Sequence, residues 1–296
     1  MTPAPALPGR AARAWPRGWR RGLLRALRHR LLLTGAVLCG GVLTVALLAD
    51  AIQVQRPERM RVGDAFAAPG AAYPFGADNL GRDVYSRVVH GARFSLLIGL
   101  ATVVLTAGAG TTLGGLAGYF RGWDEPIMRV MDALMSFPAI LLAVAITAAL
   151  GPSATNAVVA LAAVYTPRTA RMLRASVLVV REMEYVQAVY AAGASHLRVL
   201  LLHVLPNCLG PLIVQLTFVF AYAVLAEAAL SFLGMGPPPP APTWGNIIAE
   251  GRDYLREAPW ICLFPGAAIS ATVLGLNLLG DGLRDVLDPR MAVDGS

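Results

Sequence analysis

The chain has 296 residues, of which 56% are hydrophobic and 15% are charged, and its mean hydropathy is +0.58. A soluble domain usually carries about 25% charged residues, so this composition argues against a soluble protein and indicates a membrane protein. All 25 basic residues are arginines. The lack of lysine excludes a phosphate-binding loop that ends in Gly-Lys, a Schiff-base lysine and a serine–lysine nucleophile pair. If the protein uses ATP, another chain must bind it.

Stretches without charged side chains divide the chain into membrane spans. A spanning helix needs about 20 apolar residues. The stretch 133–167 is too long for one helix and contains the turn signal Gly151-Pro152-Ser153, so we divide it there. The sequence then predicts an all-α polytopic membrane protein with about six transmembrane helices, at roughly 31–51, 94–119, 127–150, 154–174, 205–233 and 259–283.

The arginines predict the orientation of these spans. Residues 1–30 contain eight arginines and no acidic residue, which predicts a cytoplasmic N-terminus. Alternating from there, the cytoplasmic segments hold 17 arginines and the outer segments hold 8, so both termini are predicted to be cytoplasmic. A cleaved twin-arginine signal at Arg20-Arg21 is the alternative. It is disfavoured because the apolar run that follows exceeds the usual length of about 7–15 residues.

The chain is expected to divide into an Arg-rich, partly disordered cytoplasmic tail, a first helix with an external segment, a five-helix core and a short tail, at 1–30, 31–93, 94–290 and 291–296. The core includes a cytoplasmic segment, 175–204, and an external segment, 235–258. Trp244 and Trp260 suit anchoring at the membrane interface.

The cytoplasmic segment 175–204 is the most informative part of the sequence. Residues 184–192 favour a helix with a surface of small side chains, and Gly193 interrupts it, which predicts two short helices at an angle. Pro206 suits the first turn of the next spanning helix. Such a compact knob could be gripped by another protein, although an ordinary surface helix is the alternative.

The residue order in this segment resembles the EAA loop of ABC importer permeases, in which EAA is followed by three residues, Gly, nine residues and I-x-LP. Here Gln187, Val189 and His203 depart from that pattern, whereas the Gly and Leu-Pro positions match it. The resemblance implies that this loop is the coupling helix, which docks in a groove of the ATPase subunit. It implies contact through Gln187, Ala188, Gly193, Ala194, Ser195, Leu205 and Pro206. Gln187 replaces the family's Glu and so removes one possible charged contact.

Further stretches are similar to the second permease subunit of dipeptide, oligopeptide and nickel ABC importers, at 73–87, 225–234, 242–246 and 277–290. This resemblance covers about residues 25–290 and implies a type I ABC importer permease core in the bacterial inner membrane. Such a subunit forms half of a translocation pathway and is not itself an enzyme.

The partners that the resemblance implies are a homologous permease subunit, one or two ATPase subunits that carry ATP and Mg, an extracytoplasmic binding protein and the lipid bilayer. No cofactor, metal or nucleic acid is expected on this chain. The expected substrate is a dipeptide or oligopeptide, and a nickel chelate or another small solute is the alternative.

Glu227, Asn277 and Asp281 are candidates for the pathway or its gate. Glu227 lies near the external end of its helix and should face the bundle interior, because a carboxylate that faces lipid costs several kcal/mol. It can line a gate, pair with an arginine or make a packing contact. Asn277 and Asp281 are one turn apart near the inner end of the last span and can hydrogen-bond across helices. Asp132 is expected to pair with Arg129 in an i,i+3 ion pair.

Two other functions compete with transport by an ABC permease. Gly280-Asp281 resembles part of an intramembrane aspartyl protease motif, but Leu278 stands where GxGD requires glycine. A channel or secondary transporter would leave the segment 175–204 without a purpose, and no inverted repeat is visible. Both functions are therefore disfavoured.

The predicted topology can be tested with single cysteines in a Cys-free background. A cysteine at Arg59 or Arg252 should react with an impermeant thiol reagent added outside intact cells, because both positions fall in external segments. A cysteine at Glu184 should stay unlabelled until the membrane is permeabilised. Labelling of Glu184→Cys in intact cells would rule out the six-span topology.

Overall fold

The computed structural model describes residues 29–287. The predicted tail 1–30 lies almost wholly outside the described residues, and the tail 291–296 lies wholly outside them. The helices are α2 (Arg30–Leu47), α3 (Ala49–Ile52), α4 (Val84–Tyr119), α5 (Arg121–Met135), α6 (Ala139–Leu150), α7 (Ala154–Arg181), α8 (Glu184–Ala191), α9 (His196–Val199), α10 (Leu209–Phe232), α11 (Trp244–Gly251) and α12 (Trp260–Leu287). Within the described range the only β-pairing is an isolated bridge between Ala77 and Asp83. The all-α prediction is confirmed.

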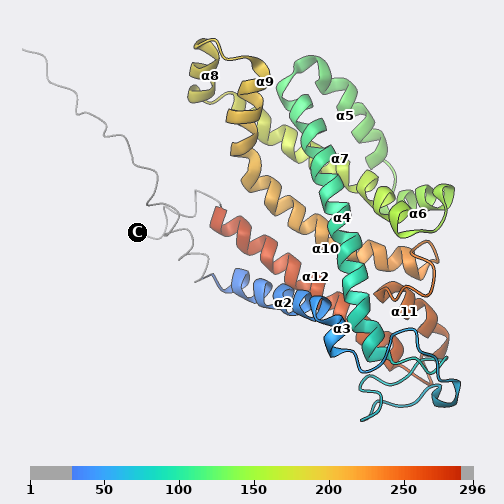
Figure 1. The fold of residues 1–296 in the computed structure, drawn as a ribbon. Helices are drawn as coiled ribbons and strands as arrows, with labels where there is room; N and C mark the ends of the chain where they lie inside the picture. Colours follow the sequence, from blue (N-terminus) through green and yellow to red (C-terminus); the bar gives the residue numbers. More distant parts are fainter. Residues whose placement is uncertain (1–28, 288–296) are drawn as a thin grey trace, which may run out of the picture.

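The helices form an elongated bundle with two different ends (Figure 1). The helix α4 runs along the bundle and links these ends. At one end, here named the α8 end, lie α8, α9 and the junction of α4 with α5. At the other end, here named the α11 end, lie α11 and the segment 53–83 that connects α3 to α4.

Four helical segments are long and apolar enough to cross a membrane, namely Arg30–Leu47, Val84–Tyr119, His196–Phe232 and Trp260–Leu287. The pair α5 and α6 adds a fifth if it counts as one bent span. The helix α7 is 28 residues long, about 42 Å, and lies along α4, but its arginines lower its hydropathy. Each of the six predicted spans therefore has a counterpart in the bundle.

The structure differs from the prediction at the start of α4 and within the predicted span 127–150. The helix α4 begins at Val84 rather than at 94. The Asp83 side chain accepts a hydrogen bond from the Ser86 N–H and caps the helix there, so its first turns contain polar residues. The predicted single helix 127–150 is broken after Met135, and its two halves meet at 93°. Pro138 accounts for this break, because proline lacks an N–H and disfavours helical geometry in the residue before it.

The helical segment that precedes α10 is longer and less regular than the sequence predicts. The helical run starts at His196 and passes through a π-helical turn at Leu200–Val204 and a 3-10 turn at Leu205–Cys208 before α10 begins. Pro206 lies in the first turn of the 3-10 segment, where its missing N–H costs no helical bond. The α9 helix is thereby continuous with a membrane span.

Glycines bring α4 and α7 into close contact. A methyl group on Gly114 would come within 2.4 Å of the Ala170 carbonyl oxygen, and one on Gly118 would come within 2.7 Å of Val177. Gly110 meets Thr169 in the same way at 2.7 Å. Small residues four positions apart allow helix backbones to approach in a membrane, where packing rather than hydrophobic burial drives association. This contact fixes the register of α7 against α4.

Trp244 has a different role from the predicted anchoring at the membrane interface. Its side chain is 1% exposed, and its indole Nε1–H donates to the Val88 carbonyl oxygen at 2.9 Å. Trp260 is half-buried and donates to the Ala77 carbonyl oxygen at 3.1 Å. The interface prediction is wrong for Trp244, because the segment 235–258 folds back onto α4 and buries the indole in the core.

The α4–α7 contact can be tested with a matched pair of glycines on α4. We expect Gly114→Ala to destabilise the purified protein by about 1–3 kcal/mol, the usual cost of overpacking, because the backbone of α7 cannot move away locally. Gly108→Ala should be neutral or slightly stabilising, since nothing lies within 4 Å of its added methyl group. Thermal unfolding in detergent measures both changes. Equal midpoints for the two variants would contradict the packing described above.

Candidate functional site

The two short helices expected around Gly193 are present at the α8 end. Gly193 has φ +87°, a left-handed conformation that glycine adopts without strain. Its N–H donates to the Tyr190 carbonyl oxygen at 3.0 Å, and the Ala194 N–H donates to the Val189 carbonyl oxygen at 3.4 Å. These two bonds form a Schellman motif, which ends α8 and turns the chain towards α9. The predicted break at Gly193 is confirmed.

The structure sorts the predicted coupling residues into two groups. Gln187, Ala188, Gly193, Ser195 and Pro206 are exposed, whereas Ala194 and Leu205 are partly buried and pack against an apolar cluster. That cluster contains Leu173, Val177, Val180, Val186, Val199, Leu200, Val204 and Cys208. Ala188, Gly193 and Ser195 are the small residues of the exposed group. The partly buried group packs the short helices α8 and α9, here named the knob, against the ends of α7 and α10.

Gln187 also has a role within the chain. Its side-chain amide donates to the Arg181 carbonyl oxygen at 2.9 Å and so satisfies a carbonyl at the end of α7. An ionised Glu has no N–H or O–H with which to make this bond. The departure from the EAA pattern at this position therefore replaces a charge with a hydrogen-bond donor that braces α8 against α7.

Aromatic side chains that were not predicted from the sequence attach α8 and α9 to neighbouring parts of the chain. The His196 ring nitrogens contact the Tyr119 hydroxyl at 3.3 Å and the Tyr190 hydroxyl at 3.2 Å. The Tyr185 hydroxyl donates to the His203 carbonyl oxygen at 3.3 Å, and burial raises the pKa of Tyr185, which favours the protonated donor. His196 and Tyr190 lie close in sequence, but only the fold brings Tyr119 to them, so spacing alone could not have revealed this cluster.

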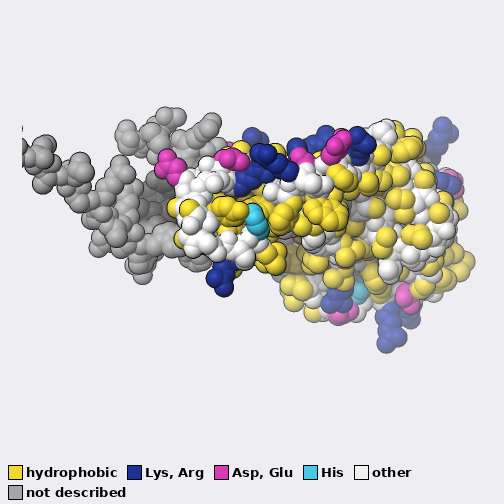
Figure 2. Space-filling model, turned by 90° about the horizontal axis from the view of Figure 1, so that it is seen from above, with side chains coloured by type: hydrophobic (Ala, Val, Ile, Leu, Met, Phe, Trp, Pro, Cys, Tyr) yellow, Lys and Arg dark blue, Asp and Glu magenta, His cyan; other side chains and the backbone are white. Residues whose placement is uncertain are grey.

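Figure 2 looks onto the α8 end, where hydrophobic side chains cover much of the visible surface and charged side chains gather towards its edges. Arginines of α7 form ion pairs with acidic residues of α5. The Arg174 guanidinium contacts Asp124 of α5 at 2.5 and 2.6 Å, and Arg171 pairs with Asp132. The predicted pair of Asp132 with Arg129 is wrong, because Arg129 pairs with Glu125 one turn away.

Glu227 lies in the bundle interior, as expected, but none of the arginines in the described range pairs with it. Its side chain is 0% exposed and accepts hydrogen bonds from Ser95 Oγ at 2.9 Å and Ser231 Oγ at 2.7 Å. The Thr243 hydroxyl donates to Ser231 Oγ at 3.3 Å and extends the network to the start of α11. These contacts make Glu227 a polar link between α4, α10 and the segment 235–258, which favours the packing role over the gate.

Asn277 and Asp281 lie one turn apart on α12, towards its C-terminal end, whereas Glu227 lies near the α11 end. Asn277 is half-buried and Asp281 is exposed. Neither side chain hydrogen-bonds to another residue within 29–287, so the cross-helix bond that the sequence allows is not formed among the described residues. The three pathway candidates do not form one site.

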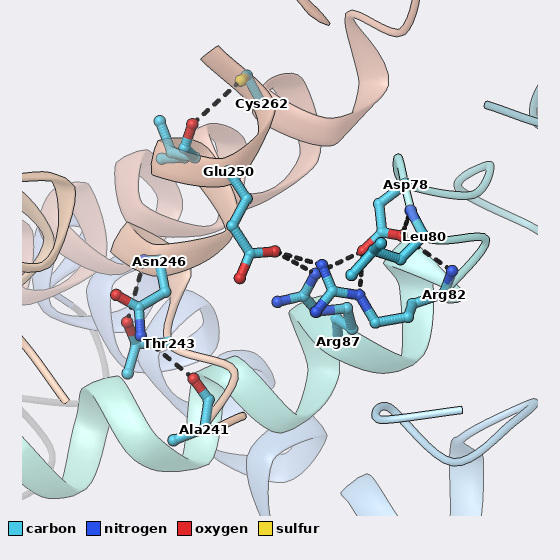
Figure 3. Close-up of polar contacts among 10 residues, drawn as sticks. Asp78, Leu80, Arg82, Arg87, Ala241, Thr243, Asn246, Glu250 and Cys262 are labelled. Carbon is cyan, nitrogen blue, oxygen red and sulfur yellow. Dashed lines mark hydrogen bonds and ion pairs between the residues drawn. The ribbon is translucent and has the colours of Figure 1, made fainter. Parts of the chain in front are cut away.

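A buried ion cluster, not foreseen from the sequence, fixes the α11 end (Figure 3). Asp78 Oδ2 accepts from Arg82 Nε at 2.6 Å and from an Arg87 guanidinium nitrogen at 2.5 Å. Both arginines also donate to Glu250 Oε2 of α11, at 2.5 and 2.7 Å. Two cations and two carboxylates neutralise one another there, and the charges tie the segment before α4 to α11.

The family model described as "Binding-protein-dependent transport system inner membrane component" matches residues 110–293. A Brucella abortus protein named as a peptide transport system permease is 54% identical over 271 residues, 92% of each chain. The dipeptide transport system permease protein DppC of Alkalihalophilus pseudofirmus is 41% identical over 92% of this chain and 90% of its own. Among solved structures, an inward-facing MetNI methionine ABC transporter chain matches with TM-score 0.58 and 18% identity, over 68% of this chain and 96% of that one.

The two roles considered for Glu227 predict different outcomes for two variants. If the carboxylate is a packing link, Glu227→Gln should keep transport and near-normal stability, because the amide fits the same site. Glu227→Ala should destabilise the protein by at least about 2 kcal/mol, because it leaves a cavity and unpaired hydroxyls. Thermal unfolding and substrate uptake measure the two properties. Lost transport in a fully stable Glu227→Gln protein would instead identify a gate charge.

Proposed function

The chain belongs to the family of binding-protein-dependent transport system inner membrane components and is a multi-pass subunit of the bacterial inner membrane, and from that premise we propose that it forms half of the translocation pathway of an ATP-driven peptide importer. The other half is a homologous permease subunit. Peptide is the proposed substrate because similar proteins over nine-tenths of the chain are named as peptide or dipeptide transport permeases.

The exposed knob formed by α8, Gly193 and α9 carries the coupling part of the proposal. A chain without lysine has no phosphate-binding loop of the Gly-Lys type, so ATP with its Mg is bound and hydrolysed by separate ATPase subunits. The small exposed side chains of α8 allow close approach of such a subunit. The helical run from His196 to Phe232 then gives a direct connection from the knob into a membrane span.

At the α11 end, the external segments are proposed to receive the extracytoplasmic binding protein. A groove of about 580 Å³ opens there between the proline run and α11, and its lining includes Pro237, Asn246, Glu250 and Arg252. Asn246 donates to the Pro237 carbonyl oxygen at 2.8 Å and holds the proline run in place. The groove offers both charged and apolar surface to a partner.

Gly193 gives the sharpest test of coupling. A methyl group at Gly193 would meet nothing within 4 Å inside the chain, so Gly193→Leu leaves the core intact. It does force a side chain into φ +87° and places a bulky group on the proposed docking surface, with a backbone cost of about 1–3 kcal/mol. We expect normal expression but loss of the ATPase stimulation that loaded binding protein causes in reconstituted complexes.

Gly193→Asn is the matched control, because asparagine tolerates positive φ better than other residues with a side chain. It should retain most of the stimulation. Full stimulation in Gly193→Leu would show that the knob is an ordinary surface loop, and the proposed coupling role would then be abandoned.

A further inference from the structure

Three arginines follow one another along α7 at three-residue spacing, and two of them are neutralised. Arg171 pairs with Asp132, and Arg174 pairs with Asp124, both from α5. Arg168, the third, is exposed and makes no ion pair or side-chain hydrogen bond with any residue in the described range 29–287. The helix therefore carries one cation whose counter-charge is not supplied by this part of the chain.

Arg168 lies inside the predicted span 154–174, six residues before its end, which is about 9 Å at 1.5 Å per residue. The next residue, Thr169, packs against Gly110 of α4. Because the hydrocarbon core is about 30 Å thick, Arg168 falls within it, in the half nearer the α8 end. An arginine at this depth avoids lipid and faces water, a ligand or another protein chain.

An apolar groove of about 240 Å³ adjoins this position. It is lined by α6, α7 and α10, and Leu161, Val164 and Tyr165 form the α7 wall. These residues precede Arg168 by seven, four and three positions, so they share one face of α7 with it. The Tyr165 hydroxyl donates to the Tyr222 carbonyl oxygen at 3.2 Å and closes the floor between α7 and α10. The groove thus accepts an apolar group, with a guanidinium one turn further along.

We propose that Arg168 and this groove form a transit site for the C-terminal end of a peptide, with the terminal carboxylate on the guanidinium and the last side chain in the groove. The inference rests on the proposed function. A guanidinium binds a carboxylate through two parallel hydrogen bonds. The groove beside the guanidinium has room for one apolar side chain, so an occupant that joins a carboxylate to such a side chain fits better than a lipid phosphate. A carboxylate on the partner permease is the competing occupant.

The test uses the complete complex of both permeases and the ATPases in nanodiscs, without binding protein or ATP. The probe is a dipeptide of alanine followed by diazirine photo-leucine, either as the free acid or as its C-terminal amide. After irradiation, mass spectrometry should place the label of the free acid on α6, α7 or α10 residues that line the groove. Labelling should fall about tenfold in Arg168→Gln, the scale of one charge-assisted hydrogen bond. The amide should label the wild type as weakly.

Arg168→Lys keeps the charge and should retain most of the labelling, and Arg121→Gln, at the start of α5, should behave as the wild type. Equal labelling by acid and amide, no labelling of the groove, or full labelling of Arg168→Gln would overturn the site. Failure of Arg168→Gln to co-purify with the partner permease would overturn it in favour of an inter-subunit ion pair.

Peptide uptake into proteoliposomes that contain the wild-type complex and binding protein separates this inference from the proposed function. Uptake by the wild type together with charge-insensitive labelling would reject only the transit site. No peptide uptake by the wild type would reject the proposed substrate and the site with it.

Discussion

The close contact between α4 and α7 is the constraint on which the other features depend. Gly110, Gly114 and Gly118 leave no room between the two backbones, so α7 has one position along α4. That register brings Arg181 to the end of α4, where a guanidinium nitrogen donates to the Gly118 carbonyl oxygen at 2.7 Å. It also sets the depth of every arginine on α7. The position of α8 follows, because Gln187 braces α8 against the Arg181 carbonyl oxygen.

The bend between α5 and α6 allows acidic residues to neutralise arginines that this register places along α7. A helix with arginines along it cannot lie against lipid without acids to neutralise them. The straight part of α5 brings Asp124 and Asp132 to two of those arginines. After Met135 the chain turns by 93°, and the apolar α6 packs on the first half of α7 instead. The bend therefore separates a charged contact from an apolar one, and Arg168 lies near the junction.

Hydropathy predicted the positions and the order of the long helical segments, because charge-free length is a local property. Gly193 was predictable for the same reason, since a glycine after a run of helix formers ends the helix. The ion pair of Asp132 was mispredicted because Arg129 of α5 and Arg171 of α7 are both possible partners, and spacing in the sequence indicates only Arg129. Trp244 was mispredicted because composition cannot tell an external loop in water from one folded onto a core. The Asp78 cluster joins α11 to residues more than 160 positions earlier, which no local pattern reports.

The stretches that carry the family resemblance largely build the frame. Asp78, Arg82 and Arg87 neutralise one another with Glu250, and Glu227 is enclosed by hydroxyls. Burial and pairing leave these groups no capacity for a passing solute. A solute or partner can contact only side chains that the fold leaves open, and these include the knob around Gly193, the groove beside Arg168 and the groove at the α11 end. The buried parts of the motifs therefore stabilise the fold, and the exposed side chains of the knob and of the two grooves indicate where a solute or a partner can bind.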